Sequence, residues 1–201
     1  MSALSEVESK LGWISLPSGG CKPSVVCGTD RTRPRTMHGY LRRRGDDLWL
    51  YASDSYIAVG LKVSGTASEG WVPRPALEAI ERGDWATQLN STTWRTRPTS
   101  TGSTISTATH DVATEIASEV FPYESLEVPL HAEREPVALA RIALDSVLTA
   151  RLSKALGAGA ATYGGGVVLH FAGPKEPIRV TSRVHDASER VGAQMPVRES
   201  S

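Results

Sequence analysis

Residues Asp46–Val63 read DDLWLYASDSYIAVGLKV, and their pattern of apolar side chains decides the predicted fold. Apolar residues alternate along two runs, Leu48–Ala52 and Tyr56–Val63, and a period of two is typical of β-strands. The link between the runs, Ser53–Ser55, contains only serine and aspartate, which favour turns because their side chains hydrogen-bond nearby backbone groups. We therefore predict two β-strands back to back, joined by a tight turn.

The alternation also predicts which side chains share a face of each strand. In the first strand, one face carries Leu48, Leu50 and Ala52, and the other carries Trp49 and Tyr51. In the second strand, one face carries Ile57, Val59, Leu61 and Val63, and the other carries Tyr56, Ala58, Gly60 and Lys62.

Outward from this hairpin, the order of a helix followed by three strands recurs along the chain. The first unit, about residues 1–68, has a helix over Ala3–Trp13, a strand over Arg35–Arg43 and the hairpin. The second, 70–118, has a strand at Trp71–Pro73, a helix over Arg74–Arg82, and strands over Trp85–Leu89, Thr92–Arg97 and Thr104–His110. The third, 131–201, has a strand over Val137–Ala143, a helix capped by Asp145 or Ser146 that runs through Leu156, and strands over Val167–Phe171, Ile178–Ser182 and Val191–Arg198. A proline-bounded connector, 119–130, precedes the third unit. These units predict an α+β fold built mainly from antiparallel sheet.

Composition describes an ordinary globular chain with no strong charge bias. The 201 residues can bury a core, and 22 basic residues balance 22 acidic ones, so only a local basic face would attract nucleic acid. Two cysteines, Cys21 and Cys27, favour reduced thiols in a cytoplasmic protein, although a disulfide between them stays open. The N-terminal residues lack a signal-peptide pattern, and no apolar run approaches the ~18 residues of a membrane span.

The motifs of common enzymes are missing from the sequence. There is no Walker-type phosphate loop, no G-x-S-x-G nucleophile motif and no histidine pair at helical ligand spacing. The five histidines are scattered singly, and His110-Asp111 has no third partner. We therefore predict no catalytic residues, no metal site and no cofactor.

Basic residues recur on the predicted helices. For the run Arg42–Arg44 we favour a solvated turn. Arg151 and Lys154 lie three residues apart and point the same way on their helix, and the second unit's helix adds Arg74 and Arg82. Such a surface can follow a phosphate backbone without reading sequence.

Four segments, in order, resemble the bacterial DNA polymerase III β sliding clamp family. Leu50–Ala58 resembles that family's A-T-D-G-x-R-L-A hairpin, and Trp71–Leu77 resembles its I-P-x-K-A-L entry to a helix. Val120–Pro129 resembles its F-P-D-Y…P connector, and Gln194–Arg198 resembles its terminal M-P-M-R strand. The chain departs from the pattern at Ile57, where the family has arginine, and at Ser55, where it has glycine. The family's aspartate after Phe-Pro is absent, since Tyr123 follows Pro122 directly.

The resemblance implies clamp-type units with sheets outside and helices on one inner face. Residues 1–130 would form one complete domain, and 131–201 a half domain ending in the M-P-V-R strand. The family docks partner peptides in an apolar pocket, which here implies Ser53, Asp54, Ser55, Ala58, Pro129, Met195, Pro196, Val197 and Arg198. The DNA-facing residues would be Arg74, Arg82, Arg151 and Lys154.

Two functions follow as expectations. The first is a processivity factor that encircles or lies on duplex DNA and tethers a DNA polymerase or other partners that carry a clamp-binding motif. The second is a clamp-fold interaction module, a decoy or regulator, that no longer binds DNA. About three units cannot close a ring alone, so we expect a homo-oligomer or association with another clamp chain.

Overall fold

The computed structural model describes residues 12–17, 20–30, 32–67, 69–81, 85–89, 94–98, 121–132, 135, 137, 143–158, 166–173, 175–183 and 189–197. In chain order the elements are β1 (Gly12–Ser15), the short 3-10 helices η1 (Pro23–Val25) and η2 (Pro34–Thr36), β2 (Gly39–Arg44), β3 (Asp47–Ser53), β4 (Ile57–Gly65), β5 (Gly70–Val72), α2 (Arg74–Glu81), β6 (Trp85–Leu89), β7 (Trp94–Pro98), α4 (Tyr123–His131), α5 (Ser146–Ala155), β8 (Val167–His170), β9 (Ile178–Ser182) and β10 (Arg190–Gln194).

The predicted hairpin is the centre of the sheet. Strands β3 and β4 pair antiparallel from Leu48 opposite Val63 to Ser53 opposite Ala58. The neighbouring strands extend the sheet in the order β5-β2-β3-β4-β10-β9-β8. Strand β4 is long enough to take two partners along one side. Its beginning pairs with β10, and its end pairs with β1, which carries β6 and β7.

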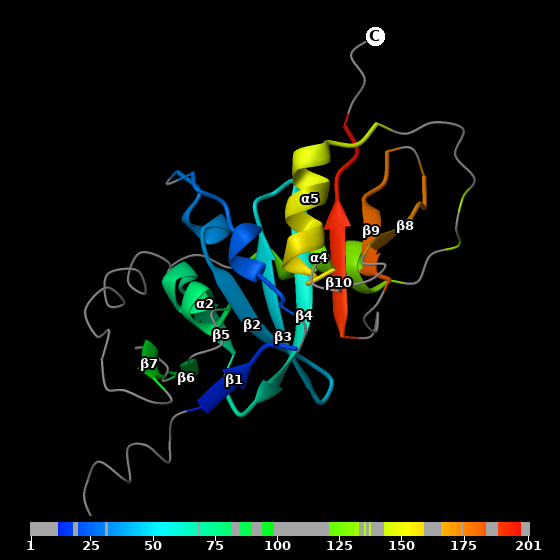
Figure 1. The fold of residues 1–201 in the computed structure, drawn as a ribbon. Coiled ribbons are helices and arrows are strands. Elements are labelled where there is room, and N and C mark those ends of the chain that lie inside the picture. The colour runs from blue at the N-terminus through cyan, green and yellow to red at the C-terminus, as the bar shows by residue number, and fades with distance from the viewer. Residues whose placement is uncertain are drawn as a thin grey trace, which may run out of the picture.

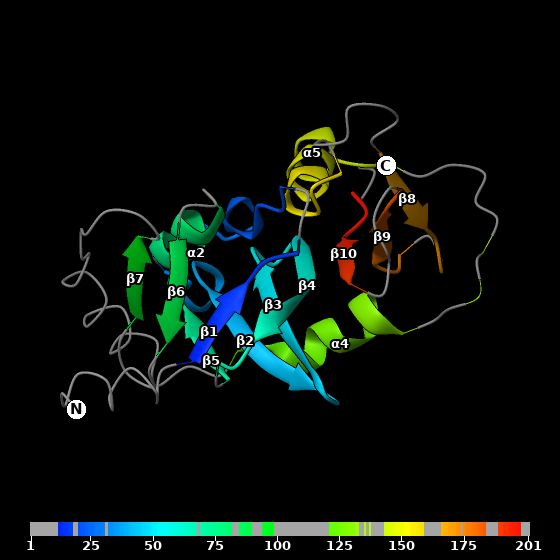
Figure 2. The same cartoon turned by 60° about the horizontal axis from the view of Figure 1, so that its bottom comes forward.

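Helices α2 and α5 lie on one face of the sheet and α4 lies on the other, as Figures 1 and 2 show together. Each face has its own apolar core. The core under α2 and α5 contains Leu50, Val59 and Leu61, together with Leu77 and Leu152 from the two helices. The core under α4 is largely aromatic and contains Trp49, Tyr51, Phe121 and Tyr123. The alternation along the hairpin therefore assigned the leucine face and the aromatic face correctly.

Helix α5 begins where the sequence predicts and packs closely on β10. The Asp145 carboxylate accepts hydrogen bonds from the backbone amides of Val147 and Leu148, which is an N-cap. Gly192 of β10 faces the helix, and a Cβ added there would lie 2.7 Å from Leu152 Cδ1. The absence of a side chain at Gly192 lets the helix approach the strand.

Several predicted elements have different bounds in the structure. Residues Gly12 and Trp13 belong to β1, not to the end of the predicted first helix, whose residues 3–11 lie outside the described residues. The predicted strand Arg35–Arg43 begins at Gly39, because Pro34 leads into η2. Strand β10 ends at Gln194 rather than Arg198. The predicted strand Thr104–His110 and residues 138–142 of the strand Val137–Ala143 also lie outside the described residues.

The predicted connector needs the largest correction, because it contains helix α4 with Pro129 inside it. Tyr123, Leu126 and Leu130 fall on one side of this helix and pack on the aromatic face of the sheet. That burial stabilises the helix despite the backbone N–H that proline lacks. The domain boundary at 130 stays a prediction, and the pairing of β10 with β4 carries one sheet across it.

Among the described residues, none of the helices combines the length and apolar content of a membrane span.

Candidate functional site

An apolar cavity of about 270 Å³ opens beside the hairpin turn. Most of its lining comes from three segments that are distant in sequence: the β3–β4 turn, residues 121–129 at and within α4, and the end of β10. Two residues of η2 and Pro177 complete it. Its lining residues are Arg35, Thr36, Ser53, Ser55, Tyr56, Ile57, Ala58, Phe121, Pro122, Ser125, Leu126, Pro129, Pro177, Ala193, Gln194 and Met195. We call this set the apolar cavity.

The turn that forms one wall is fixed by its own polar side chains. Asp54 Oδ1 accepts hydrogen bonds from the amides of Tyr56 and Ile57, both at 2.9 Å. Ser53 Oγ accepts from the Ser55 amide at 3.1 Å and donates to the Ile57 carbonyl at 2.9 Å. These bonds hold Ser55 at φ 82°, in the left-handed region that favours glycine. Glycine would adopt this backbone conformation without strain.

The base of the cavity comes from paired strands. Ile57 is buried and lies opposite Gln194 in the β4–β10 ladder. Gln194 is held from the far side, where its Oε1 accepts from Thr149 Oγ1 and its Nε2 donates to the Asp145 carbonyl. Because Ile57 is buried, it supplies apolar surface where the family's arginine would bring charge.

Met195 follows the strand and forms the rim of the cavity. Its amide donates to the Tyr56 carbonyl at 2.9 Å, which continues the pairing past the end of β10. The side chains of Met195 and Tyr56 are 42% and 60% exposed. Two large apolar side chains at the mouth of an apolar cavity are typical of a binding site rather than of a sealed core.

The opposite wall, α4, is attached to the sheet by a chain of polar contacts. Tyr51 Oη lies 2.9 Å from His131 Nε2, and Glu127 accepts from Arg44 Nε at 3.0 Å. Burial lowers the pKa of His131 to about 4, with Arg44 as a further cause, so the ring is neutral near pH 7. Burial also raises the pKa of Tyr51. The wall is therefore held by a neutral Tyr–His contact and a partly exposed ion pair.

Five of the nine predicted pocket residues line the apolar cavity: Ser53, Ser55, Ala58, Pro129 and Met195. Pro196 and Val197 follow Met195 but do not line it; the Val197 amide donates to the Ala143 carbonyl. Asp54 turns its carboxylate to the other side of the turn, and Arg198 lies outside the described residues.

Sequence reasoning missed the other eleven lining residues, among them Arg35, Leu126 and Pro177. Arg35 stood in a basic stretch that was assigned to a strand. Leu126 stood in the connector, where a spacing of three and four residues from Tyr123 to Leu130 was a helical signal. Nothing in the local sequence around Pro177 indicates that it reaches the cavity.

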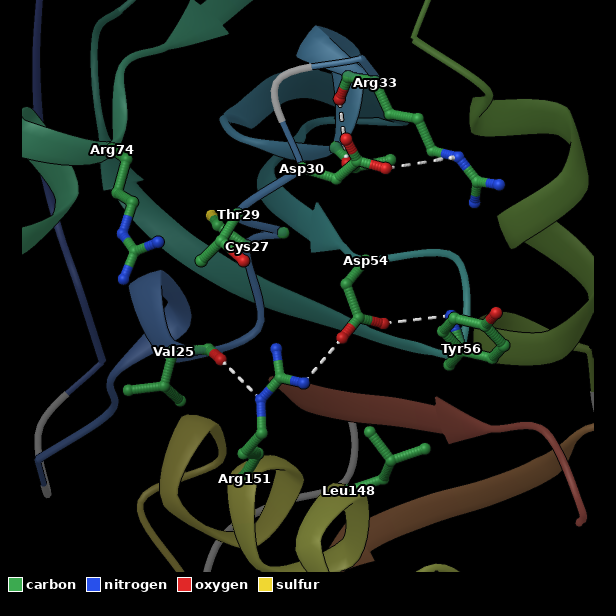
Figure 3. A pocket seen from close by; sticks show the side chains of 12 residues that line it. Val25, Cys27, Thr29, Asp30, Arg33, Asp54, Tyr56, Arg74, Leu148 and Arg151 are labelled. Carbon is green, nitrogen blue, oxygen red and sulfur yellow. Dashed lines mark hydrogen bonds and ion pairs between the residues drawn. The ribbon is translucent and has the colours of Figure 1, made fainter.

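A second groove of about 680 Å³, with both charged and apolar residues in its lining, lies on the helix side of the same turn. Figure 3 shows Arg151 reaching from α5 to Asp54 and to the Val25 carbonyl, with Arg74 at the far side of the groove. Arg151 Nη1 lies 2.7 Å from Asp54 Oδ2, and Arg151 Nε donates to Val25 at 2.9 Å. We call this space the helix-side groove.

The structure brings together two of the predicted DNA-facing residues, Arg74 and Arg151, in the helix-side groove. Both have carboxylate partners, since Arg74 Nε lies 2.9 Å from Glu78 Oε1 and Arg151 contacts Asp54. Lys154, on α5, is exposed, and Arg82 lies outside the described residues. Because these carboxylates offset the charges of Arg74 and Arg151, the groove attracts a phosphate backbone less strongly.

Neither space offers a reactive nucleophile or a metal site within the described ranges. Burial raises the pKa of the Cys27 thiol to about 12, so it stays protonated in the helix-side groove. His38 is buried, and its Nδ1 accepts from the Arg74 amide at the start of α2. Across the part of the chain that the structure describes, no cluster of three or more histidine, cysteine and acidic side chains is placed to hold a metal.

The fold is that of the bacterial DNA polymerase III β sliding clamps. The structure resembles a sliding clamp from Bartonella birtlesii bound to griselimycin, with a TM-score of 0.59 and 14% identity over 94% of this chain and 66% of that chain. It resembles the β subunit from Thermotoga maritima with a TM-score of 0.56 and 10% identity, over 94% and 65% of the two chains. It resembles the Helicobacter pylori β clamp bound to a DNA ligase peptide with a TM-score of 0.53 and 11% identity, over 94% and 66%.

The chain therefore spans about two thirds of the length of the solved clamps that it resembles. No family model and no curated protein matches its sequence. At 10–14% identity these neighbours show the fold alone.

Proposed function

We propose that this protein is a non-catalytic tether with the sliding-clamp fold, whose apolar cavity docks a short extended peptide of a DNA polymerase or another replication or repair protein. The observation that carries this proposal is the apolar cavity itself. Segments distant in sequence converge there, Ile57 at the base is buried and apolar, and Tyr56 and Met195 stand exposed at the mouth. An extended peptide would place alternate side chains into such a cavity beside the end of a β-strand.

The test is a fluorescence anisotropy titration with the DNA ligase peptide named for the Helicobacter pylori complex. Met195→Ala removes apolar surface from the rim, and about 1 kcal/mol of lost burial weakens binding about fivefold. Val128→Ala is the matched control, because Val128 is an exposed apolar residue of α4 that does not line the cavity. Equal affinities of wild type and Met195→Ala for the peptide would contradict the proposal that the peptide docks in the apolar cavity.

We further propose that the face with α2 and α5 lies against duplex DNA, with Lys154 as an exposed cation of that face. The alternative is a clamp-fold interaction module that docks peptides without binding DNA, and the carboxylate partners of Arg74 and Arg151 favour it. Titration of labelled duplex DNA at about 50 and 200 mM salt separates the two. Weak binding that falls steeply with salt supports DNA contact, whereas no binding at low salt supports the alternative.

Assembly into a ring is also part of this proposal. Within the described residues, β5, β7 and β8 each pair on one side only, so each presents a strand edge. A head-to-tail tetramer of three-unit chains would reach the clamp family's twelve units, and association with a full-length clamp is the other arrangement that we propose. The mass in solution tests this, and a strict monomer at micromolar concentration would exclude a homo-oligomeric ring.

A further inference from the structure

The β3–β4 turn forms part of the wall of both spaces. Tyr56, which follows the turn, lines the apolar cavity and the helix-side groove. Asp54 lines the groove and not the cavity, whereas Ser53 and Ser55 line the cavity and not the groove. A change in the conformation of this short segment on one side therefore alters the wall on the other side.

The Asp54 carboxylate connects the two sides of the turn. Its Oδ1 accepts hydrogen bonds from the amides of Tyr56 and Ile57, both at 2.9 Å. Its Oδ2 lies 2.7 Å from Arg151 Nη1 of helix α5. These contacts support a backbone conformation that is strained for a residue other than glycine, since Ser55 is at φ 82°. A weaker contact with Arg151 would therefore let the turn relax, and part of the cavity wall would move with it.

Arg151 is the member of this pair that a ligand can reach more easily. Its side chain is 31% exposed, against 10% for Asp54, and its guanidinium lies within the groove between Val25 and Asp54 (Figure 3). The bond from Nε to the Val25 carbonyl keeps the guanidinium in place when its carboxylate contact changes. Arg74 lines the far side of the same groove. Arginine pairs with phosphate oxygens through two parallel N–H bonds, so a phosphate group is the ligand chemistry that suits this space.

We propose that the helix-side groove is a regulatory anion site, in which a phosphate group that pairs with Arg151 weakens the contact with Asp54 and lowers the affinity of the apolar cavity for its peptide. The inference rests on the proposed docking function and adds its regulation. A phosphate at Arg151 lies beside the Asp54 carboxylate, where the two negative charges repel, or takes its place. The turn is then relaxed for part of the time, and the apparent peptide affinity falls with the fraction of molecules whose cavity wall stays in place.

The test is a titration of the labelled ligase peptide into wild type with and without inorganic pyrophosphate, with sodium chloride used to match the ionic strength. We expect peptide binding to be about two- to fivefold weaker in pyrophosphate, which is the range that a partly exposed ion pair can supply. A parallel titration with duplex DNA in place of pyrophosphate identifies the source of the phosphate. An effect of DNA alone assigns the site to backbone phosphates, and an effect of pyrophosphate assigns it to a free phosphate ligand.

Two variants test whether the effect passes through Arg151 and the turn. Arg151→Gln should bind the peptide about as weakly as wild type does in pyrophosphate, and pyrophosphate should not weaken its binding further. Ser55→Gly keeps Arg151 but removes the backbone strain, so its peptide affinity should respond less to pyrophosphate. Arg183→Gln is the matched control, because Arg183 is exposed and lines neither space, so the response should persist. Circular dichroism checks that each variant is folded.

Equal peptide affinity of wild type with and without both phosphate probes would overturn this inference and leave peptide docking intact. A response that survives Arg151→Gln, or one that is undiminished in Ser55→Gly, would overturn it as well. Failure of the ligase peptide to bind wild type without any phosphate would overturn the docking proposal together with the regulation that rests on it.

Discussion

Replacing Asp54 with alanine tests how much its side chain stabilises the β3–β4 turn, which lies between the apolar cavity and the helix-side groove. The Asp54 side chain is 10% exposed, bonds two backbone amides through Oδ1, and pairs with Arg151 through Oδ2. Each lost amide hydrogen bond costs about 1 kcal/mol. Loss of the ion pair adds about 1 kcal/mol, the upper value for an exposed pair, because the Arg151 side chain is 31% exposed and keeps its bond to the Val25 carbonyl. We therefore expect Asp54→Ala to lower the free energy of unfolding by about 3 kcal/mol.

Urea unfolding followed by circular dichroism measures this change. Two further variants separate the contribution of the amide hydrogen bonds from that of the ion pair. Asp54→Asn keeps an oxygen acceptor for the amides and should lose about 1–2 kcal/mol. The double-mutant cycle of Asp54→Ala with Arg151→Ala should give a coupling of about 1 kcal/mol. Asp30→Ala is the control in the same groove, where the carboxylate is exposed and its pair with Arg33 is long, and it should change stability far less. A loss below about 0.5 kcal/mol in Asp54→Ala would refute the reasoning.

Three further predictions follow from the fold. Ser55→Gly should raise the unfolding free energy by about 0.5–1 kcal/mol, since glycine adopts φ 82° without strain; a lower melting temperature would contradict this. Gly192→Ala should lower it by about 1–3 kcal/mol in urea unfolding, because the new Cβ meets Leu152 at 2.7 Å; unchanged stability would show that α5 shifts freely. Burial lowers the pKa values of His38 and His131 to about 4. Between about pH 6.5 and pH 4 the unfolded chain therefore binds more protons than the folded chain, and the free energy of unfolding decreases as the pH decreases. The free energy of unfolding in urea should be about 3 kcal/mol lower at pH 5.5 than at pH 7.5. His38→Gln and His131→Gln should each reduce this difference, and equal stability at both pH values would contradict the burial argument.

The hairpin was predictable because the alternation of apolar residues that forms it lies within a short stretch of sequence. Alternation in Leu48–Ala52 and Tyr56–Val63 identified the strands and assigned their faces, which became the leucine core and the aromatic core. The cap at Asp145 and the helix that follows it were predictable for the same reason, since an N-cap acts within one turn.

The parts that depend on long-range contacts were not predictable from local pattern. Pro129 indicated a boundary, yet the aromatic face of the sheet stabilises a helix through it. Asp54 was expected in the peptide pocket, but its carboxylate is drawn to Arg151, a residue predicted to face DNA. Arg35 reaches the apolar cavity only because Pro34 begins η2 in place of a strand. The first two depend on a partner remote in the chain, and the cavity that Arg35 lines is built by segments remote from it.

A titration of the isotope-labelled protein with the ligase peptide, read by amide chemical shifts, tests most directly that the apolar cavity docks a linear peptide. The account predicts that the largest shifts fall on the amides of Ser55, Ala58, Ala193 and Met195, and that Gly28 and Thr29 in the helix-side groove stay unchanged. Shifts centred on the helix-side groove, or none at saturating peptide, would contradict it.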